Sequence, residues 1–375
     1  MSSSYAAGDE IEFRVEKIVP RGLGLGFGEK LTVFVPLAAP GDLLRVRITN
    51  IRKRTAFAEI VEVIEAGPHR IQPPCPYFGV CGGCDFQQLD YKAQLAAKTG
   101  IIRDCLHRIG KIDLDDDIPM IGSPKDFSYR SRARWHLDRD TKTLGYYRRD
   151  SHEVVDIQVC PIATPELQAT LEKVRETVDW NRVWTERAEL EGAVGDHEQS
   201  SLFSRDMPEA TADLTFAAGG EIYSYSAETF FQANQFLIDD LIETAIGNTG
   251  GGMAFDLYSG VGLFTLPLAR RFERVLAVEG SQASVAYAKR NVENAGLANV
   301  KVIAKGVEKF LLENRTGDVD LVLIDPPRSG TEKRTIPAIV ELKPNAISYV
   351  ACEPAMLARD LRVLLDGGYQ MDSIT

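Results

Sequence analysis

One cysteine stands in the C-terminal half of this sequence, at a place that suits a reactive thiol. Cys352 ends the apolar segment Ile347-Ser-Tyr-Val-Ala, and Pro354 opens a helix-like segment directly after it. This pattern predicts a buried strand that carries a thiol at its carboxyl end, the edge of an open α/β sheet where ligands bind. The alternative is a structural cysteine packed in a core. Other residues predicted at the same edge of the sheet help to decide whether Cys352 is reactive or structural.

A glycine-containing turn is the first of these features. Asp256-Leu-Tyr-Ser-Gly-Val-Gly262 follows a predicted strand and precedes a predicted helix, so Gly260 lets the backbone approach a ligand at a helix N-terminus. The third glycine of the dinucleotide fingerprint is absent, and the next strand ends at Glu279. A carboxylate there accepts hydrogen bonds from both ribose hydroxyls, unless it is an ordinary surface glutamate. The pattern favours S-adenosylmethionine over a dinucleotide.

Two further motifs carry groups that suit a nucleobase substrate. Asp325-Pro-Pro-Arg328 ends the fourth predicted strand, and its prolines fix an extended backbone from which Asp325 reaches cofactor or substrate. Methyltransferases that act on exocyclic amines have an aromatic residue where this chain has Arg328, which argues against that chemistry. In Phe230-Phe-Gln232, the aromatics are either core residues or include one that stacks on an extruded base while Gln232 contacts the cofactor.

A cysteine cluster lies near residue 80. Cys75, Cys81 and Cys84 fall within ten residues, and Cys160-Pro161 supplies a plausible fourth thiol. Zinc sites usually use evenly paired Cys-x2-Cys knuckles, whereas three clustered cysteines and a distant Cys-Pro resemble iron–sulfur ligation. The spacing therefore favours iron–sulfur over zinc, and Cys105 is expected to be a packing residue.

Composition and charge limit the number of domains, the class of partner and the cellular compartment. The 375 residues are 44% hydrophobic, which predicts two or three globular domains, and the formal net charge of -11 argues mildly against a nucleic-acid partner. Two arginine-rich stretches favour a nucleic-acid partner instead. They are 45–54 and 130–149, and the second begins with Arg130. No membrane-length apolar stretch and no signal pattern are seen, so we expect a cytoplasmic protein without a membrane partner, whose cysteines are reduced, metal-bound or catalytic.

The elements that position these residues follow from periodicity. Short alternating segments separated by glycines predict a small antiparallel β-barrel, and the region from the cysteine cluster to about residue 220 mixes patterns, with a turn-rich acidic segment at 190–212. Regular β–α alternation then predicts a doubly wound parallel sheet. The predicted barrel strands are 11–18, 32–35, 43–49 and 57–64, the later strands 253–257, 274–278, 300–304, 320–325 and 346–351, and the bounded helices 234–246, 281–295 and 354–365.

Taken together, these motifs resemble the RNA uracil-C5 methyltransferases, in the branch with a TRAM barrel and a [4Fe–4S] cluster. The resemblance rests on the cysteine cluster and on Phe-Phe-Gln-Ala-Asn-Gln, Asp-Leu-Tyr-Ser-Gly-Val-Gly, Asp-Pro-Pro-Arg and Tyr-Val-Ala-Cys-Glu-Pro-Ala. The resemblance implies a TRAM-like RNA-binding barrel over 8–66, a central α+β iron–sulfur domain over 67–220 and a Rossmann-like methyltransferase domain over 221–375. It implies as cluster ligands Cys75, Cys81, Cys84 and Cys160, as S-adenosylmethionine contacts Gln232, Tyr258, Glu279 and Asp325, as stacking aromatic Phe230 and as nucleophile Cys352.

The family's chemistry explains the need for a thiol. Uracil C5 is a poor nucleophile, so a thiolate adds to C6 and makes C5 an enolate carbon that attacks the sulfonium methyl group. A base then removes the C5 proton, and elimination frees the cysteine. Arg328 or Arg359 is expected to lower the thiol pKa. The family's base is a glutamate beyond the sixth strand, whereas this sequence stops at Thr375, so we expect a C-terminally truncated sheet that lacks its last strands.

Several substrates and classes remain open at this stage. The leading hypothesis is methylation of 23S rRNA, with tRNA as the near alternative and no protein partner evident. Radical methylthiotransferases also combine a TRAM barrel with iron–sulfur, but Cys75, Cys81 and Cys84 do not follow their Cys-x3-Cys-x2-Cys spacing. A third reading is an RNA-binding remnant that holds cofactor and substrate without turnover.

Overall fold

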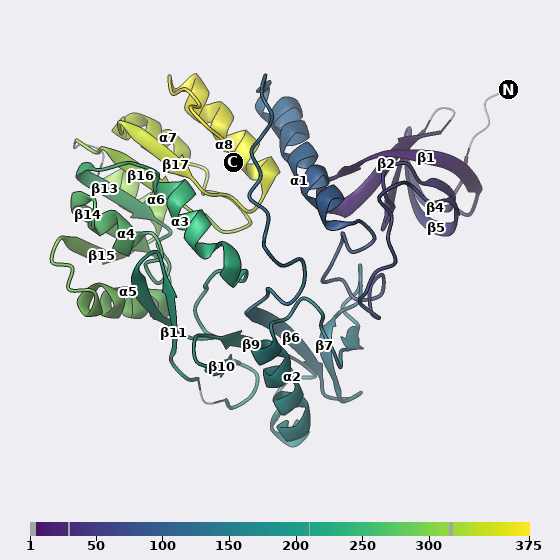
Figure 1. Cartoon of the computed structure of the whole chain (residues 1–375), viewed down its shortest axis with the longest axis horizontal. Helices are drawn as coiled ribbons and strands as arrows, with labels where there is room; N and C mark the ends of the chain where they lie inside the picture. The colour runs from purple at the N-terminus through teal and green to yellow at the C-terminus, as the bar shows by residue number, and fades with distance from the viewer. Residues whose placement is uncertain (1–4, 29–30, 210, 315–317) are drawn as a thin grey trace. The chain divides into compact units, whose positions relative to one another are not determined.

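The computed structural model describes residues 5–28, 31–209, 211–314 and 318–375, and its chain divides into two compact units (Figure 1). The first unit comprises residues 1–108, 113–122 and 146–157, and the second comprises 109–112, 123–145 and 158–375. Each unit is described by itself. Within the described residues, no helix is both long enough and apolar enough to cross a membrane.

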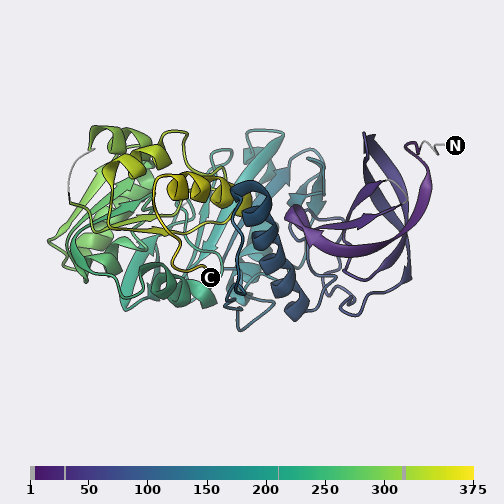
Figure 2. The ribbon, with the colours of Figure 1, turned by 90° about the horizontal axis from the view of Figure 1, so that it is seen from above.

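The first unit begins with the predicted barrel, seen from above in Figure 2. Five strands close it in the order β1-β2-β3-β5-β4, and alternate side chains point inward, among them Val33, Leu44 and Val46, which are fully buried. All pairs are antiparallel except β3 with β5. The strands are β1 (Glu10–Val19), β2 (Leu23–Phe27), β3 (Thr32–Pro36), β4 (Leu43–Arg52) and β5 (Thr55–Glu65).

Strand β2 is a correction to the sequence prediction, which treated its glycines as separators. A Cβ atom at Gly26 would lie 2.3 Å from the carbonyl oxygen of Arg14, and one at Gly24 would lie 2.6 Å from Ala38 Cβ. These glycines therefore allow the strand to approach its neighbours closely. Glycine in a strand reads as a breaker from sequence alone, because only the packing shows what a side chain would strike.

The rest of the first unit contains helix α1 (Tyr91–Cys105) and the short strand β8 (Val154–Asp156). The side chain of Asp90 caps α1 by accepting a hydrogen bond from the backbone N–H of Ala93, as N-cap residues do. Cys105, at the end of this helix, is buried, which confirms its expected packing role. A single π-helical turn, Leu106–Gly110, follows α1.

The second unit opens with an antiparallel sheet in the region that sequence patterns left unassigned. Strands β10, β9, β6 and β7 lie in that order, with helix α2 nearby, and β11 and β12 form a separate hairpin. The segment 190–212 is therefore not simply turn-rich, because it holds β10 and the end of β9. The bounds are β6 (Arg132–Asp138), β7 (Thr143–Tyr147), α2 (Pro165–Thr177), β9 (Arg187–Val194), β10 (Ser200–Phe203), β11 (Leu214–Ala218) and β12 (Glu221–Tyr225).

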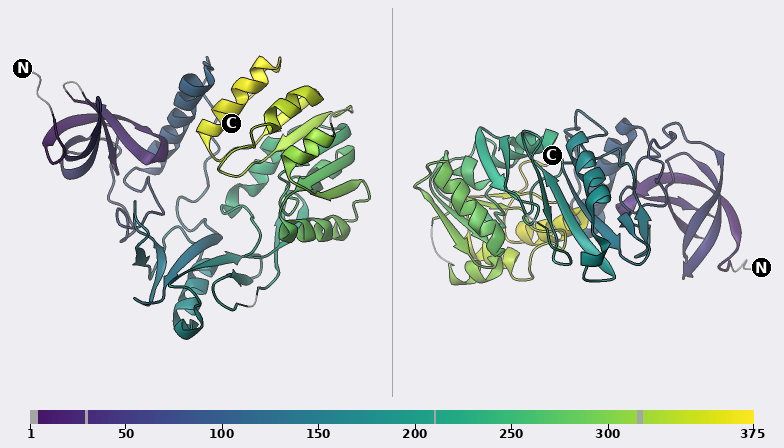
Figure 3. Two further views of the ribbon diagram at one scale, coloured as in Figure 1. Left: turned by 180° about the vertical axis from the view of Figure 1, so that it is seen from behind. Right: turned by 90° about the horizontal axis from the view of Figure 1, so that it is seen from below.

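The predicted parallel sheet is present, in the order β15-β14-β13-β16-β17. Its strands are drawn in green to yellow-green in the two further views of Figure 3. Because every strand runs the same way, their carboxyl ends meet at one edge. No sheet strand follows β17 in the described residues. The elements are α3 (Ile238–Ile246), β13 (Gly251–Leu257), α4 (Thr265–Ala269), β14 (Phe272–Glu279), α5 (Gln282–Asn294), β15 (Val300–Ala304), α6 (Val307–Glu313), β16 (Leu321–Ile324), α7 (Thr335–Leu342), β17 (Ala346–Tyr349) and α8 (Pro354–Asp366).

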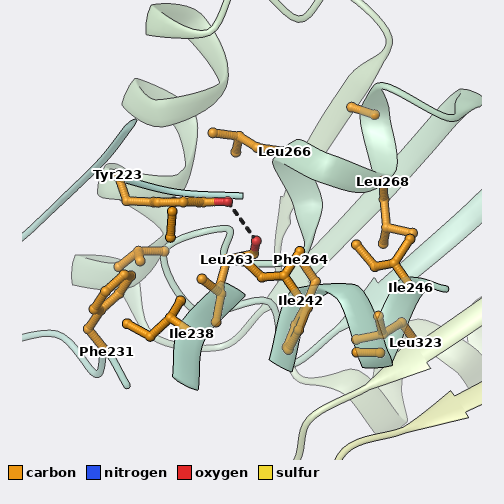
Figure 4. Close-up of a cluster of buried hydrophobic side chains, with 14 of the residues drawn as sticks. Tyr223, Phe231, Ile238, Ile242, Ile246, Leu263, Phe264, Leu266, Leu268 and Leu323 are labelled. Atoms are coloured by element: carbon orange, nitrogen blue, oxygen red, sulfur yellow. Dashed lines mark hydrogen bonds between the residues drawn. The ribbon is translucent and has the colours of Figure 1, made fainter. Parts of the chain in front are cut away.

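An apolar core joins the β11–β12 hairpin to this sheet (Figure 4). Tyr223 is fully buried, and its hydroxyl donates a hydrogen bond of 2.9 Å to the carbonyl oxygen of Leu263. Phe231 packs in the same cluster, with its ring stacked on Tyr225 at 4.4 Å between centroids. A buried tyrosine needs a hydrogen-bond acceptor, so this contact sets the hairpin's place beside the glycine-containing turn.

Candidate active site

The turn that follows β13 presents backbone rather than side chains. Tyr258, Gly260 and Gly262 have positive φ angles of 64°, 56° and 97°, a left-handed conformation that glycine adopts at little cost. The backbone N–H of Gly260 donates to Glu279 Oε2 at 2.9 Å, and that of Ser281 donates to Oε1 at 2.6 Å. Glu279 is therefore fixed at the end of β14, with a second lone pair on each oxygen for a ligand.

Asp256, the first residue of this motif, is completely buried. Its Oδ2 accepts a hydrogen bond from the Thr265 hydroxyl, whereas Oδ1 has no partner among the described residues. Burial, together with the nearby charges of Asp325 and Glu279, raises the pKa of Asp256 to about 7. The hydroxyl of Ser259 is also buried without a described partner. Orphaned buried polar atoms are rare, so these two atoms are candidates to hydrogen bond with a polar ligand.

Asp325 lies at the carboxyl end of β16. Its backbone N–H donates to the carbonyl oxygen of Leu257 at 3.3 Å, and burial raises its pKa to about 6. Tyr258 points to the loop beyond it, where its hydroxyl hydrogen bonds to Glu332. Three carboxylates, those of Asp256, Glu279 and Asp325, therefore surround the ends of β13, β14 and β16. This negative charge favours a cationic ligand.

Cys352 is exposed and lies three residues beyond the end of β17. Strand β17 is only partly buried, so the predicted buried strand is instead an edge strand of the described sheet. The net effect on the thiol is also opposite to expectation, since desolvation raises the pKa of Cys352. Arg328 acts to lower it, as expected, but Asp325 and Glu353 raise it further. Arg359 hydrogen bonds to Asp360 instead.

The two adjacent phenylalanines have different environments. Phe231 is buried in the core, whereas the Phe230 side chain is 62% exposed. The guanidinium of Arg132 lies 6.0 Å from the Phe230 ring centroid and donates hydrogen bonds to the carbonyl oxygens of Thr229 and, at 2.9 Å, Ala227. Arg132 thus holds the segment that carries Phe230, and one aromatic face stays available for stacking.

Arg130 and Gln232 lie close to this segment in the fold. The backbone of Arg130 forms an isolated bridge with Asn234, and the N–H of Ser131 donates to the carbonyl oxygen of Ala233 at 2.9 Å. The Nε atom of Arg130 is buried without a hydrogen-bond partner in the described residues. Gln232 is partly buried. The backbone of Arg130 therefore lies beside the segment 230–234, which includes Gln232.

The clustered cysteines of the first unit occupy a series of tight turns. Backbone N–H groups of Val80 and Cys81 donate to the carbonyl oxygen of Tyr77, and the N–H of Gly83 lies 3.4 Å from Cys81 Sγ. Cys75, Cys81 and Cys84 are all partly buried, as is Cys160 in the second unit. In the part of the chain that the structure describes, no three histidine, cysteine or acidic side chains are arranged to hold a metal ion.

In the barrel, some cations of the first arginine-rich stretch form ion pairs and others do not. Arg45 pairs with Glu12 and Glu62, and Arg47 pairs with Glu10 and Glu59. By contrast, Arg52 and Lys53, at the tip between β4 and β5, form no ion pair with any described residue.

Aromatic side chains accompany this tip on the outer face of the barrel. Phe57 stacks on Phe34 at 5.7 Å between centroids, and Phe27 on the next strand is 56% exposed. Unpaired cations beside exposed aromatics are typical of a surface that binds single-stranded nucleic acid.

The chain is similar to known RNA methyltransferases along most of its length. A TRAM domain model matches residues 7–61, and a model described as tRNA (Uracil-5-)-methyltransferase matches residues 203–369. An uncharacterized RNA methyltransferase from Synechocystis sp. is 30% identical, over 98% of this chain and 92% of that protein. One from Halalkalibacterium halodurans is also 30% identical, over 98% and 93%. The chain belongs to the RNA uracil-C5 methyltransferase family.

A solved structure shares the fold of this uracil-C5 methyltransferase. The crystal structure of Pyrococcus abyssi tRNA (uracil-54, C5)-methyltransferase in complex with S-adenosyl-L-homocysteine aligns with a TM-score of 0.71 at 23% identity, over 96% of this chain and 95% of that one. The barrel and the parallel methyltransferase sheet are thereby confirmed.

Two residues of this methyltransferase site escaped sequence reasoning. Asp256 opens the glycine motif, and its apolar neighbours in the strand were the only signal of its burial. Arg132 lies in the second arginine-rich stretch, where nothing in the sequence separates it from Arg130 or Arg134. Only the fold shows that Arg132 reaches the segment of Phe230.

Proposed function

We propose that this RNA uracil-C5 methyltransferase modifies 23S rRNA through a covalent bond between Cys352 and C6 of the target uracil. The observation that carries the proposal is an exposed thiol at the carboxyl edge of the methyltransferase sheet, within electrostatic reach of Arg328 and Asp325. In the proposed reaction, the Cys352 thiolate forms a bond to C6, and the electron pair of the C5–C6 double bond moves onto the C4 carbonyl as an enolate. Arg328 stabilises that negative charge.

Completion of the reaction requires loss of the C5 proton. When C5 takes the methyl group from S-adenosylmethionine, a C5–C bond would form as the S–C bond breaks, and S-adenosylhomocysteine would leave with that electron pair on sulfur. A base then takes the C5 proton, and the electron pair restores the double bond as Cys352 leaves as a thiolate. The reaction is redox-neutral and needs no metal ion in these steps. The catalytic role of Cys352 is therefore nucleophilic.

We propose that Gln232, Tyr258, Gly260, Glu279 and Asp325 bind S-adenosylmethionine, which supplies the methyl group as a sulfonium. The open backbone at Gly260 supports this, since a Cβ atom there meets no atom within 4 Å. The orphaned polar atoms and the clustered carboxylates suit a ligand that has hydroxyl and amino groups and a positive sulfur. Glu279 accepts from ribose hydroxyls in this arrangement.

For the RNA, we propose that Phe230 stacks on the extruded base and that Arg130 and Arg328 contact the substrate. The exposure of Phe230 supports stacking, and the buried, unpartnered Nε of Arg130 supports a polar ligand beside it.

We further propose three functional domains. They are an RNA-binding barrel over 8–66, a central iron–sulfur domain over 67–220 and a methyltransferase domain over 221–375.

We also propose that Cys75, Cys81, Cys84 and Cys160 ligate a [4Fe–4S] cluster. The spacing of the first three supports it, and so does the N–H of Gly83 directed at Cys81 Sγ, because backbone N–H groups near sulfur tune such clusters. No step of the methylation is assigned to it.

The nucleophile is tested with RNA that contains 5-fluorouridine, whose C5 fluorine cannot be removed as a proton can. With S-adenosylmethionine, we expect a denaturation-resistant protein–RNA adduct, detected as a shifted band, that disappears in Cys352→Ala. Cys105→Ala provides the matched control and should keep the adduct. An adduct of equal yield in Cys352→Ala would remove the nucleophile assignment.

The RNA class is tested by transfer of labelled methyl groups to 23S rRNA and to tRNA transcripts in parallel. Transfer to 23S rRNA alone is the expected result. Transfer to tRNA would support the second candidate function, which is favoured by the name of the matched methyltransferase model. Binding of both RNAs without transfer to either would indicate a remnant that no longer turns over.

A further inference from the structure

A buried carboxylate on α8 accepts hydrogen bonds from three directions. Asp360 is 3% exposed, and its Oδ2 accepts from the hydroxyls of Thr331 and Tyr349, each at 2.8 Å. Its Oδ1 accepts from Nε of Arg359 at 2.7 Å. Burial of a charge is costly unless the charge is paired and hydrogen-bonded, and here both conditions are met.

The donors come from the segments that flank the candidate nucleophile. Tyr349 ends β17, three residues before Cys352, and α8 begins two residues after it, at Pro354. Thr331 lies three residues after Arg328, in the loop that leaves β16. A single carboxylate therefore joins the chain before the thiol, the helix after it and the loop that carries Arg328.

The packing of this loop leaves it little freedom. The N–H of Gly330 donates to the carbonyl oxygen of Pro327 at 2.8 Å, and Gly330 has a φ angle of 80°. A Cβ atom at Gly330 would lie 3.1 Å from Met356 Cβ and 3.2 Å from Nη2 of Arg359, both on α8. The loop thus turns tightly and rests on α8 beside the carboxylate.

We propose that Asp360 is a positioning residue that holds the Arg328 loop against the Cys352 segment, so that the guanidinium stays beside the thiol. The proposal rests on the proposed function, in which Cys352 is the nucleophile. Asp360 does not touch the reacting atoms. It acts through the hydroxyl of Thr331 on the loop and through that of Tyr349 on the strand.

The position of Arg328 matters because of the other charged groups near Cys352. Partial desolvation raises the pKa of the Cys352 thiol, Arg328 favours the thiolate, and Asp325 and Glu353 disfavour it. Arg328 is therefore the one positive group among these three charged neighbours. A loop released from α8 would move it away and leave the opposing carboxylates in place, so the thiolate fraction at neutral pH would fall.

The test measures Cys352 directly, without RNA and without turnover. The rate of iodoacetamide alkylation of the peptide that contains Cys352 is followed by mass spectrometry as a function of pH in the folded, full-length protein. In Asp360→Asn, we expect the apparent pKa of Cys352 to rise, with a roughly 3- to 10-fold slower reaction at pH 7.5, the fall produced by about half to one pKa unit. Arg328→Gln should give a similar fall, and the double variant should fall no further than either single variant.

Matched variants separate positioning from general loss of structure. Thr331→Val removes the hydroxyl that links the loop to Asp360 and should reproduce the slower alkylation even if Asp360→Asn does not fold, whereas Thr331→Ser should restore the wild-type profile. Asp366→Asn, an exposed position on the same helix, should change nothing. A wild-type profile in Asp360→Asn or Thr331→Val, or full additivity with Arg328→Gln, would overturn the proposal. An absent 5-fluorouridine adduct with these alkylation results intact would reject the nucleophile while the positioning result stands.

Discussion

At the residue scale, the proposed cofactor site contains two carboxylates, Asp256 and Asp325, whose ionisation is costly. Asp256 is buried at the end of β13, with a pKa of about 7, and Asp325 is partly buried at the end of β16, with a pKa of about 6. An isolated buried carboxylate of this kind destabilises the fold when it ionises. A cationic ligand at this edge of the sheet, as proposed above, would offset that cost.

The first prediction concerns Asp256 and the pH dependence of stability. Its folded pKa is above the ordinary value, so the stability that Asp256 contributes is present at low pH and is lost as pH rises from about 4 to about 7. Asp256→Asn has no such loss. The variant should therefore gain stability relative to wild type between pH 5 and pH 8, by roughly 1–3 kcal/mol, since one pKa unit corresponds to about 1.4 kcal/mol.

Urea unfolding at the two pH values checks this, with Asp320→Asn as the control. Hydrogen bonds from the backbone N–H groups of Met253 and Gly252 lower the pKa of Asp320, so its contribution is present above the ordinary pKa, and its removal should cost stability at both pH values. A stability difference between Asp256→Asn and wild type that is the same at pH 5 and pH 8 would contradict the burial argument.

At the element scale, strand β2 depends on glycine for contact rather than for turning. A Cβ atom at Gly26 would meet the backbone of Arg14 at 2.3 Å and the ring of Phe13 at 2.5 Å. Gly26→Ala should therefore reduce the free energy of unfolding by about 1–3 kcal/mol, the usual cost of overpacking. Thermal or urea unfolding measures it. Gly28→Ala is the matched control, since the nearest atom lies 4.0 Å away, and equal losses at both positions would reject the explanation.

The tip between β4 and β5 is a second element with a specific consequence. Arg52 and Lys53 have no described ion-pair partner, whereas Arg47 is held by Glu10 and Glu59. The double change Arg52→Gln and Lys53→Gln should weaken RNA binding and reduce the slope of log K against log salt by about 1–2, one unit for each lost phosphate contact.

Fluorescence titration of a single-stranded RNA at several salt concentrations measures that slope. Arg47→Gln should leave the slope unchanged, because its charge is already neutralised. Phe57→Leu should weaken binding without a change of slope, since stacking involves no counterion release. An equal effect of Arg47→Gln and of the tip variant would show that the barrel binds RNA through its whole charged surface.

At the scale of the whole molecule, the cysteines have different proposed roles, one in methyl transfer and four in a metal cluster. Cys105 is packed in a core and Cys352 lies at the sheet edge, which leaves four partly buried cysteines with turns around three of them. Iron and acid-labile sulfide should be present at about four of each per chain after anaerobic purification, as the [4Fe–4S] formula requires. Cys81→Ser should lose both, whereas Cys105→Ser should keep them. Stoichiometric zinc without iron would reject the cluster.

Sequence patterns predicted most of the barrel strands, the parallel sheet and the residue types at the ends of its strands, but neither β2 nor the strands of the central region. Period-2 alternation fixed four barrel strands, and β–α alternation fixed the parallel sheet, because both patterns record which side chains one element buries by itself. Residue types identified the thiol and the glycine turn.

What only the tertiary structure decided was which charges and close contacts meet across elements. Arg47 is neutralised by strands that flank it in the barrel, Gly26 is required by a neighbouring strand, and Asp360 reaches Thr331 across 28 intervening residues. The raised pKa of Cys352 has the same origin, since partial desolvation and the carboxylates of Asp325 and Glu353 outweigh Arg328 there. Burial and electrostatics depend on separation in space, which spacing along the chain does not record.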